Sequence, residues 1–401
     1  MIAPIALRSA IVGAGFIGPH HVDAVQRGGY ARVVVIVNRD PDRGPAMARG
    51  LGVERVVSSA DDVFSDPTID VVHICTPNHT HVALARAAME AGKHVVVEKP
   101  IAIDRDGATT LLEVARQTGR HAAVALTYRG YPMVRRARDL VRAGRLGALR
   151  LVHGGYLQDW LADETDYNWR LEAAAAGASR AFADIGTHWF DTIEYVVGAP
   201  VTAVMADLAT LIPVRHRPVL TGPAFGQGSG ATEPIRVDTE DAATVLIRFA
   251  GGAIGALVVS QVSPGHKNDL TFHVSGSERS LGWAQEDPEL LWLGGREEAT
   301  LLTRGPAEND WPVGVPSLPA GHPEGWADAL RDVLRPFYAA IAAGDPPPDP
   351  AEAPYPTLAD GARGVAVIEA VVESSRTGAW VDIEPIDDLR PAAAEQKGSV
   401  R

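Results

Sequence analysis

The first third of the chain alternates between two spacings of hydrophobic residues. Short runs rich in valine and isoleucine, several of them apolar throughout, are typical of strands buried on both faces of a parallel sheet. Between them lie stretches with helical spacing, and several of these end near a glycine, as helix C-termini favour. The alternation predicts a doubly wound α/β domain over residues 1–125. The expected strands are 5–12, 33–37, 69–75, 94–98 and 122–126, and the expected helices are 16–27, 41–50, 79–91 and 105–118.

After residue 131 the strand candidates become longer, and turn signals separate them. This pattern predicts a second, α+β domain over residues 126–385, built on a large and mostly antiparallel open sheet. Its expected strands are 149–157, 201–208, 242–249, 253–262, 270–275, 289–293 and 380–383, and its expected helices are 134–143, 183–197 and 358–376. Two segments rich in glycine and proline, 213–234 and 305–323, are expected to be irregular. Residues 386–401 are expected to form a flexible tail.

Composition and charge exclude several classes of protein. The 401 residues carry 37 basic and 50 acidic side chains, so the net charge of −13 opposes binding to the phosphate backbone of nucleic acid. No apolar run approaches the roughly 20 residues that a membrane span requires, and the first eight residues lack the features of a signal peptide. The single cysteine, Cys75, excludes a disulfide framework. We therefore expect a cytoplasmic protein with no nucleic-acid or membrane partner.

A glycine-rich turn follows the first expected strand and opens the first expected helix, with the sequence Gly13-Ala14-Gly15-Phe16-Ile17-Gly18. Gly13 permits the tight turn, Gly15 lets a pyrophosphate approach the backbone, and Gly18 lets the helix pack closely on the strand. The helix N-terminus attracts the phosphate charge. The turn therefore predicts a dinucleotide site in which Phe16 and Ile17 take part, and a plain tight turn is the alternative.

The end of the second expected strand bears on the choice between NAD and NADP. An NAD site expects Asp or Glu there, about 20 residues after the glycine turn, to bind the ribose hydroxyls. The position holds Asn38, which can bind a ribose hydroxyl without repelling a 2′-phosphate, and Arg39 follows it. Asp40 is a further candidate acid. NAD and NADP both remain open as the cofactor.

Polar residues follow two further strands at their carboxyl ends, where open parallel sheets form their ligand crevice. They are Thr76-Pro77-Asn78 with His81 after one strand, and Glu98-Lys99 after another. His81 and the histidine at position 79 point to different faces of a helix, so we expect no metal site. Lys99 is one of only four lysines, whereas arginine supplies the other basic side chains. This choice favours a role that needs a titratable amine, with a surface lysine as the alternative.

A carboxylate and an imidazole lie four residues apart at Asp184 and His188. This spacing places both on one face of a helix, one turn apart. Histidine titrates near neutral pH, so His188 is a candidate general base for a hydroxyl, with Asp184 as its neighbour. A helix-capping Asp and a packed His are the alternative.

Taken together, the glycine turn, Glu98-Lys99-Pro100 and Asp184-x-x-x-His188 resemble the Gfo/Idh/MocA family of sugar and polyol dehydrogenases, in the family's order and roughly its spacing. The resemblance extends to residues 76–81 and 359–361, so it covers nearly the whole chain. It implies an N-terminal Rossmann domain, a C-terminal domain whose open sheet forms homodimers or homotetramers, and a site in the cleft between the domains. Residues 155–160, with residues 169–170, look most like those of members that oxidise a pyranose at C3.

The resemblance also implies roles for individual residues. Lys99 and His188 would form the catalytic pair, and Asp184 would bind a substrate hydroxyl. The nicotinamide half of the cofactor would be lined by Thr76, Pro77, Asn78, His81, Glu98 and Lys99. The candidates for contact with a sugar or polyol substrate are Lys99, Tyr128, Gln158, Trp160, Asp184 and His188.

These observations support one leading hypothesis and two alternatives. The leading one is an NAD(P)-dependent oxidoreductase that transfers a hydride between nicotinamide and a secondary hydroxyl of a pyranose, anhydrosugar, glycoside or cyclitol. Oxidation at C3 acidifies the adjacent C–H bond, so the first alternative is a redox-neutral enzyme that cleaves glycosides through a 3-keto intermediate. The second alternative is a non-catalytic NAD(P)-binding regulator.

Overall fold

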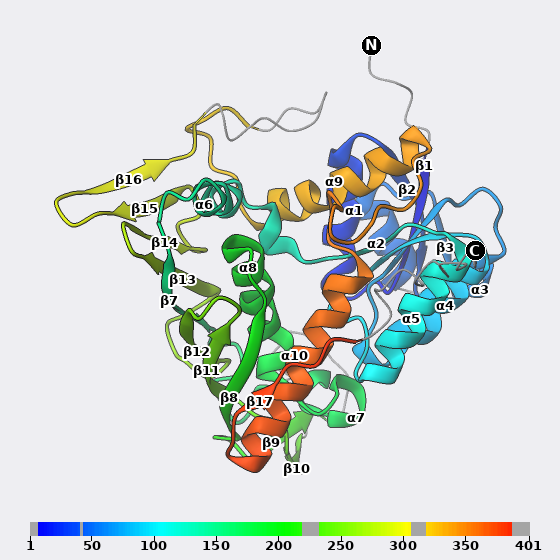
Figure 1. The fold of residues 1–401 in the computed structure, drawn as a ribbon. Coiled ribbons are helices and arrows are strands. Elements are labelled where there is room, and N and C mark those ends of the chain that lie inside the picture. Colours follow the sequence, from blue (N-terminus) through cyan, green and yellow to red (C-terminus); the bar gives the residue numbers. More distant parts are fainter. Residues whose placement is uncertain (1–6, 41–42, 219–231, 306–317, 387–401) are drawn as a thin grey trace, which may run out of the picture.

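A computed structural model of the protein describes residues 7–40, 43–218, 232–305 and 318–386. The described residues form two large sheets, with helices between them, and a separate two-stranded ribbon (Figure 1). The first sheet has six parallel strands in the order β3-β2-β1-β4-β5-β6. They are β1 (Leu7–Val12), β2 (Ala31–Val37), β3 (Arg55–Val57), β4 (Val71–Ile74), β5 (His94–Val97) and β6 (Ala122–Val124), and the helices that connect them are α1 (Gly18–Gly28), α2 (Arg43–Leu51), α3 (Asp61–Phe64), α4 (His81–Glu90) and α5 (Arg105–Thr118).

Both faces of this first sheet are buried. On β1, Ile11 joins one hydrophobic cluster and Val12 joins another, and both side chains are at most 3% exposed. Successive residues of a strand point to opposite faces, so an apolar residue at every position is needed to bury both. The continuous valine and isoleucine runs therefore have a structural cause, and the predicted doubly wound α/β class is confirmed.

The second sheet has nine strands in the order β16-β15-β14-β13-β7-β12-β11-β8-β17. Neighbours are antiparallel throughout except for β7 and β12, which are parallel, so the predicted mostly antiparallel open sheet is confirmed. The strands are β7 (Leu149–Leu157), β8 (Val201–Ala209), β11 (Ala242–Phe249), β12 (Ile254–Ser260), β13 (Asp269–Gly276), β14 (Ser280–Ala284), β15 (Leu290–Gly294), β16 (Ala299–Thr303) and β17 (Val381–Asp382).

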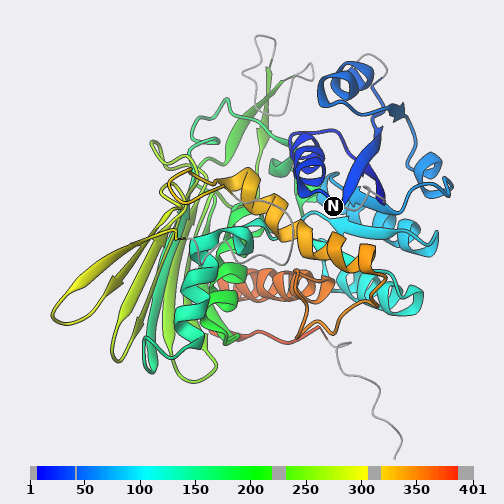
Figure 2. The same cartoon turned by 90° about the horizontal axis from the view of Figure 1, so that it is seen from above.

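Among the described residues, helices lie against one face of the second sheet, the face toward the first sheet (Figure 2). Strand β11 shows the consequence, because its residues alternate between buried and exposed along most of its length. The helices of this half are α6 (Pro132–Arg142), α7 (Ala173–Ala176), α8 (Thr187–Val197), α9 (Trp326–Ala343) and α10 (Leu358–Thr377), and its short turns are η2 (Thr127–Gly130), η3 (Trp169–Leu171) and η4 (Phe182–Gly186). Within the described ranges, none of the helices combines the length and apolar character that crossing a bilayer requires.

Two late helices join the halves of the molecule. Helix α10 packs on β8 of the second sheet and on α5 and β6 of the first. Helix α9 lies beside α1, and its Leu334, Phe337 and Tyr338 belong to the same hydrophobic cluster as Ile11 and Val22 (Figure 1). Residues 326–343, which the predicted boundary places in the second domain, thus complete a core of the first sheet.

The sequence pattern did not predict α9. Pro336 lies inside this helix, and an interior proline normally signals a helix end. The pattern also missed β3, α3, β14 and β16.

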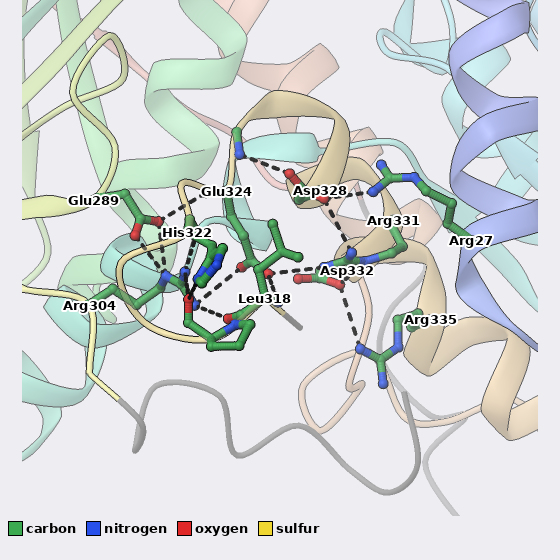
Figure 3. A network of polar contacts seen from close by, with 12 residues as sticks. Arg27, Glu289, Arg304, Leu318, His322, Glu324, Asp328, Arg331, Asp332 and Arg335 are labelled. Atoms are coloured by element: carbon green, nitrogen blue, oxygen red, sulfur yellow. Dashed lines mark hydrogen bonds and ion pairs between the residues drawn. The ribbon is translucent and has the colours of Figure 1, made fainter. Parts of the chain in front are cut away.

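A polar network fixes the start of α9 (Figure 3). Arg304, which follows β16 and whose side chain is fully buried, donates to the carboxylate of Glu289 at 2.8 Å and to the carbonyl oxygen of His322 at 2.6 Å. At the first turn of α9, Asp328 accepts from the backbone N–H of Gly325 at 3.0 Å and from Arg27 of α1 at 2.7 Å. The network therefore connects the β15–β16 hairpin to the first helix of the chain.

One expectation about the loops is wrong. The segment 213–234, expected to be irregular, carries β9 (Val214–Pro218) and β10 (Thr232–Arg236) at its two ends, and these strands pair antiparallel. Pro218 and Pro234 weaken the local strand signal because proline cannot donate to a ladder. The pairing of segments that are distant in sequence supplies what the local sequence lacks. Residues 219–231, 306–317 and 387–401, which include almost all of the predicted tail, lie outside the described residues.

We expect Gly130→Ala to destabilise the protein. A Cβ atom at position 130 would lie 1.9 Å from the backbone carbonyl oxygen of Ala329 on α9, so a backbone segment would have to move. Overpacking of this kind typically costs about 1–3 kcal/mol. Gly364→Ala in α10 is the matched control, because its added Cβ meets no atom within 4 Å. Urea unfolding measures both variants, and equal stabilities would contradict the close approach of η2 and α9.

Candidate active site

The glycine turn after β1 has the geometry of a dinucleotide site. Gly13 has a φ of +104°, and a Cβ atom there would lie 2.6 Å from the carbonyl oxygen of Cys75. A Cβ on Gly18 would lie 2.4 Å from the carbonyl oxygen of Gly13, whereas one on Gly15 would meet no atom within 4 Å. Gly13 and Gly18 are thus required for packing, and Gly15 faces open space.

The first turn of α1 is suited to an anion. The N-cap residue, Ile17, makes no capping hydrogen bond, and the turn holds no acidic side chain. Backbone N–H groups at a helix N-terminus bind phosphate through their partial positive charge. Phe16, beside this turn, is 58% exposed. The turn and the open space over Gly15 therefore fit the pyrophosphate of a nicotinamide dinucleotide.

The end of β2 presents an amide in place of the usual carboxylate. The Asn38 side-chain oxygen accepts from the backbone N–H of Asp40 at 3.0 Å, which fixes the turn. Arg39 is exposed, and within the described ranges its guanidinium forms no ion pair. Because position 38 carries no carboxylate, its side chain does not repel a 2′-phosphate.

The polar residues after β4 brace the loops of the crevice. The Thr76 hydroxyl is 2.5 Å from that of Thr80, and Asn78 donates to the carbonyl oxygen of Ala176 on α7 at 3.1 Å. The His81 ring is fully buried, with Nδ1 2.8 Å from the carbonyl oxygen of Pro100 and Nε2 2.7 Å from that of Thr76. His81 therefore holds the loops after β4 and β5 together, and Pro77 and Thr76 stay half-buried at the edge of the crevice.

Among the residues that the structure describes, no three His, Cys, Asp or Glu side chains gather as a metal site would require. Position 79 also differs from position 81, because His79 is exposed and its Nδ1 lies 3.4 Å from the carbonyl oxygen of Ala175. The two histidines thus point in different directions.

Lys99, just after β5, meets Asp184 of η4 from the other half of the chain. The Lys99 Nζ atom lies 2.9 Å from Asp184 Oδ1 and 2.6 Å from its carbonyl oxygen. The two side chains are only 12% and 15% exposed. The ion pair therefore brings together two residues that the sequence pattern predicted separately.

Two further donors surround the same carboxylate. Arg170 Nε lies 3.1 Å from Asp184 Oδ1, and Gln261 Nε2 lies 2.9 Å from Oδ2. Burial alone would raise the pKa of Asp184, but the charges of Arg170 and Lys99 outweigh it and hold that pKa well below its usual range. Asp184 is thus an anion that accepts from three side chains.

The segment around Asp184 differs from the single regular helix expected over 183–197. Residues Phe182–Gly186 form a π-helical turn, and α8 begins only at Thr187. The expectation of one regular α-helical turn between Asp184 and His188 is therefore wrong. The buried carboxylate of Glu240 holds the start of this turn, because it accepts from the backbone N–H groups of Arg180 at 2.9 Å and Phe182 at 2.8 Å. Turns of this kind occur frequently at functional sites.

The His188 imidazole is half-buried beside the ion pair. Its ring packs edge-on against Tyr128, with 4.9 Å between ring centroids, and no described residue forms a hydrogen bond with it. Burial, reinforced by the Lys99 charge, lowers the pKa of His188 to about 3. At neutral pH the ring is therefore uncharged and can accept a proton.

The candidate substrate residues belong to a second polar group. Trp160 Nε1 donates to Gln158 at 2.8 Å, and Gln158 donates to Asn268 at 3.1 Å. Tyr128 is 1% exposed and is hydrogen-bonded to Tyr156 and Asn268. Gln158 and Trp160 are half-buried and are therefore more accessible than Tyr128. Tyr128 supports the site from within the core.

Sequence reasoning assigned no role to four residues that the structure brings to the site. They are Tyr156, Arg170, Gln261 and Asn268. Tyr156 and Arg170 fall in the segments that resemble the family, which was a usable signal. Gln261 reaches Asp184 because it follows the end of β12, which lies against η4, and no local pattern predicts this contact.

Comparisons with known proteins agree with this geometry. A model of an oxidoreductase family with an NAD-binding Rossmann fold matches residues 7–126, and a Gfo/Idh/MocA C-terminal domain model matches residues 134–282. Levoglucosan dehydrogenase of Pseudarthrobacter phenanthrenivorans is 32% identical, over 95% of this chain and 99% of its own. The chain belongs to the Gfo/Idh/MocA family of oxidoreductases.

Solved structures of other members have the same fold over almost their whole length. A levoglucosan dehydrogenase in complex with NADH and L-sorbose superimposes with a TM-score of 0.83 at 31% identity, covering 95% of this chain and 100% of that one. An inositol dehydrogenase homologue from Azotobacter vinelandii, in complex with NADH and myo-inositol, gives 0.80 at 28% identity, covering 94% and 98%. As a Gfo/Idh/MocA member, the protein is an NAD-binding oxidoreductase.

We expect Lys99→Met to lower kcat by at least about a hundredfold, because it removes the ammonium that contacts Asp184 beside His188. The glycine turn is unchanged, so the nucleotide dissociation constant should stay within about twofold of the wild-type value. Steady-state kinetics and a fluorescence titration measure the two quantities. Unchanged turnover would remove Lys99 from the mechanism.

Lys93→Met is the matched control for this variant. Lys93 is also a buried lysine, but its ammonium donates to the carbonyl oxygens of Asp66 and Ile69 at 2.5 and 2.9 Å. We expect this variant to lose stability and to keep kcat.

Proposed function

We propose that the protein catalyses reversible hydride transfer between a nicotinamide dinucleotide and a secondary hydroxyl of a pyranose, anhydrosugar, glycoside or cyclitol. One observation carries the proposal: the buried Lys99–Asp184 ion pair lies beside an uncharged His188, at the carboxyl edge of a sheet with a dinucleotide turn. The names of the relatives, which include levoglucosan dehydrogenase and scyllo-inositol 2-dehydrogenase, support this substrate class.

The chemistry divides between the cofactor and the side chains. Bound NAD supplies the hydride acceptor. His188 takes the hydroxyl proton as the C–H bond breaks, because its ring is uncharged and free of protein hydrogen bonds within the described residues. The Lys99 ammonium stabilises the negative charge that develops on the substrate oxygen. In the reverse direction His188 returns the proton.

Asp184 orients the Lys99 ammonium beside His188. Arg170 shares the Oδ1 atom of Asp184 with Lys99, and Gln261 holds Oδ2, so the carboxylate that binds the Lys99 ammonium has a fixed position. Gln158 and Trp160 are the candidates for substrate contact. The indole offers a flat apolar face for a sugar ring, and Gln158 offers an amide for its hydroxyls.

The test is the appearance of reduced nicotinamide when the purified protein meets NAD or NADP separately, with levoglucosan, glucose, glycosides and inositols. We expect stoichiometric NADH and a keto product with at least one member of this panel. The amide at Asn38 and the exposed guanidinium of Arg39 are the reason to include NADP. Release of free aglycone with only catalytic NAD would favour the redox-neutral cleaving enzyme. Nucleotide binding without any turnover would contradict the proposal and favour a regulator.

We further propose that the uncovered face of the nine-stranded sheet binds a second copy of the chain. Apolar side chains on this face are 36–59% exposed, and helices cover only the opposite face (Figure 2). These side chains lie on five strands of the sheet. They are Leu151, Met205, Leu246, Ile254, Val258 and Trp292. Exposed apolar area of this extent marks protein interfaces. We propose that this contact forms a homodimer or a homotetramer. We also propose that the protein is cytoplasmic.

Sedimentation velocity tests the assembly. We expect Leu246→Arg combined with Ile254→Arg to convert the oligomer into monomers, because two charges per copy would be buried without partners. Val214→Arg is the matched control, since Val214 is equally exposed but lies on the separate β9–β10 ribbon. A wild-type monomer, or a doubly substituted variant that still assembles, would contradict the proposed interface.

A further inference from the structure

A chain of hydrogen bonds crosses the core of the first sheet and ends at the candidate site. Its five side chains come from five different elements: Ser9 from β1, His21 from α1, His73 from β4, Glu98 from the end of β5 and Tyr338 from α9. Glu98 Oε1 lies 2.8 Å from His21 Nε2, and the two histidines meet through their Nδ1 atoms at 2.7 Å. His73 Nε2 lies 2.6 Å from the Tyr338 hydroxyl, which lies 2.8 Å from the Ser9 hydroxyl.

The core around this chain is apolar. Ser9, His21 and His73 are 0% exposed, and the strand neighbours of His73 are valine and isoleucine. Burying polar groups costs free energy unless each one finds a partner, and a valine at position 73 would avoid that cost. The mechanism proposed above uses neither His73 nor Tyr338, so these residues call for a separate explanation.

At its far end, this chain of hydrogen bonds has no simple path to solvent. It stops at Ser9, which is fully buried, and Tyr338 is 3% exposed. A closed chain of this kind is better suited to fixing an arrangement of protons than to carrying protons away. The near end is different, because Glu98 precedes Lys99 and one of its oxygens accepts from the Lys99 backbone N–H at 3.2 Å.

The donors and acceptors of this hydrogen-bond chain are arranged in one direction. Burial holds the pKa of His73 well below its usual value, so that ring is neutral. Burial raises the pKa of Glu98, but its hydrogen bond with His21 and the charge of Lys99 outweigh it and lower that pKa, so the carboxylate is ionised. An ionised carboxylate can only accept, so His21 donates from Nε2.

For two neutral rings the remaining bonds are then determined. His21 Nδ1 accepts from His73 Nδ1–H, His73 Nε2 accepts from the Tyr338 hydroxyl, and Tyr338 accepts from Ser9. Every donor in the chain points toward Glu98.

We infer that His73 and Tyr338 are positioning residues: acting through His21, they hold the Glu98 carboxylate ionised and oriented toward the nicotinamide half of the cofactor site, so that the protein favours the oxidised nucleotide. This inference rests on the proposed function and on the family resemblance, which implies that Glu98 lines that half of the cofactor site. The nicotinamide ring is a cation when oxidised and neutral when reduced. A partly buried carboxylate nearby therefore attracts one form more than the other.

The test is the ratio of the dissociation constants for NAD⁺ and NADH, which needs no turnover. In Glu98→Gln we expect the constant for NAD⁺ to rise about tenfold relative to that for NADH. The double variant His73→Val/Tyr338→Phe leaves Glu98 in place but removes the donors behind His21. We expect it to shift the ratio in the same direction by about threefold, with NADH binding changed less than twofold.

Tyr355→Phe is the matched control. Tyr355 lies in the same hydrophobic cluster, and its hydroxyl is also bonded to a buried histidine, His121 Nδ1, at 2.8 Å. The other ring nitrogen of His121 lies 2.9 Å from the carbonyl oxygen of Asp345, and among the described residues no hydrogen bond links this pair to Glu98. The control should leave the ratio of constants unchanged. Thermal melting of all variants checks that they are folded.

Nitrogen-15 NMR of the histidine rings in the nucleotide-free protein gives an independent readout. We expect His21 with its proton on Nε2 and His73 with its proton on Nδ1. The opposite tautomers, or a cationic His21, would overturn the inferred direction.

The outcomes separate this inference from the proposed function. A double variant with the wild-type ratio, beside a shifted Glu98→Gln, would show that the chain does not act through Glu98. An unshifted Glu98→Gln that still turns over sugars would overturn the inference and leave the function standing. A wild-type protein that binds neither nucleotide would contradict the proposed function, and it would overturn this inference as well.

Discussion

The contact between Lys99 and Asp184 is the interaction on which the site depends. Each residue comes from a different half of the molecule, and the pair is nearly closed to solvent. A buried charge without a partner costs free energy, so the Lys99 ammonium and the Asp184 carboxylate stabilise each other there. The halves must therefore dock closely, and α9 and α10 secure this docking because each packs against elements of both.

Local irregularity around the pair has a physical basis. The π-helical turn places Asp184 one element before His188, and the buried Glu240 carboxylate stabilises its first N–H groups. Arg170 and Gln261 then complete the shell around Asp184. The result is an anion held by cations beside an imidazole that stays neutral, and the proposed mechanism assigns charge stabilisation to the ion pair and proton acceptance to the imidazole.

The rarity of lysine was a sound signal for Lys99, but it was not sufficient. Lys93 is also a lysine and is more deeply buried, yet its ammonium donates to two backbone carbonyls away from Asp184. What distinguishes Lys99 is its place at the carboxyl end of a parallel strand, where the crevice of such sheets lies. His81 shows the same limit of local sequence signals, because its position in a motif did not reveal that both ring nitrogens face backbone carbonyls.

The sequence by itself determined the two-sheet architecture, the glycine turn and the strand ends that carry Lys99 and Glu98. These features follow from hydrophobic periodicity and from the conformational freedom of Gly13, which act over a few residues. Only the tertiary structure decided that Gln261 meets Asp184, that α9 completes the first core, and that Tyr338 reaches His73. Those contacts join residues 77 to 265 positions apart, and the packing of whole elements determines them. No local pattern encodes which distant donor will meet a buried acceptor.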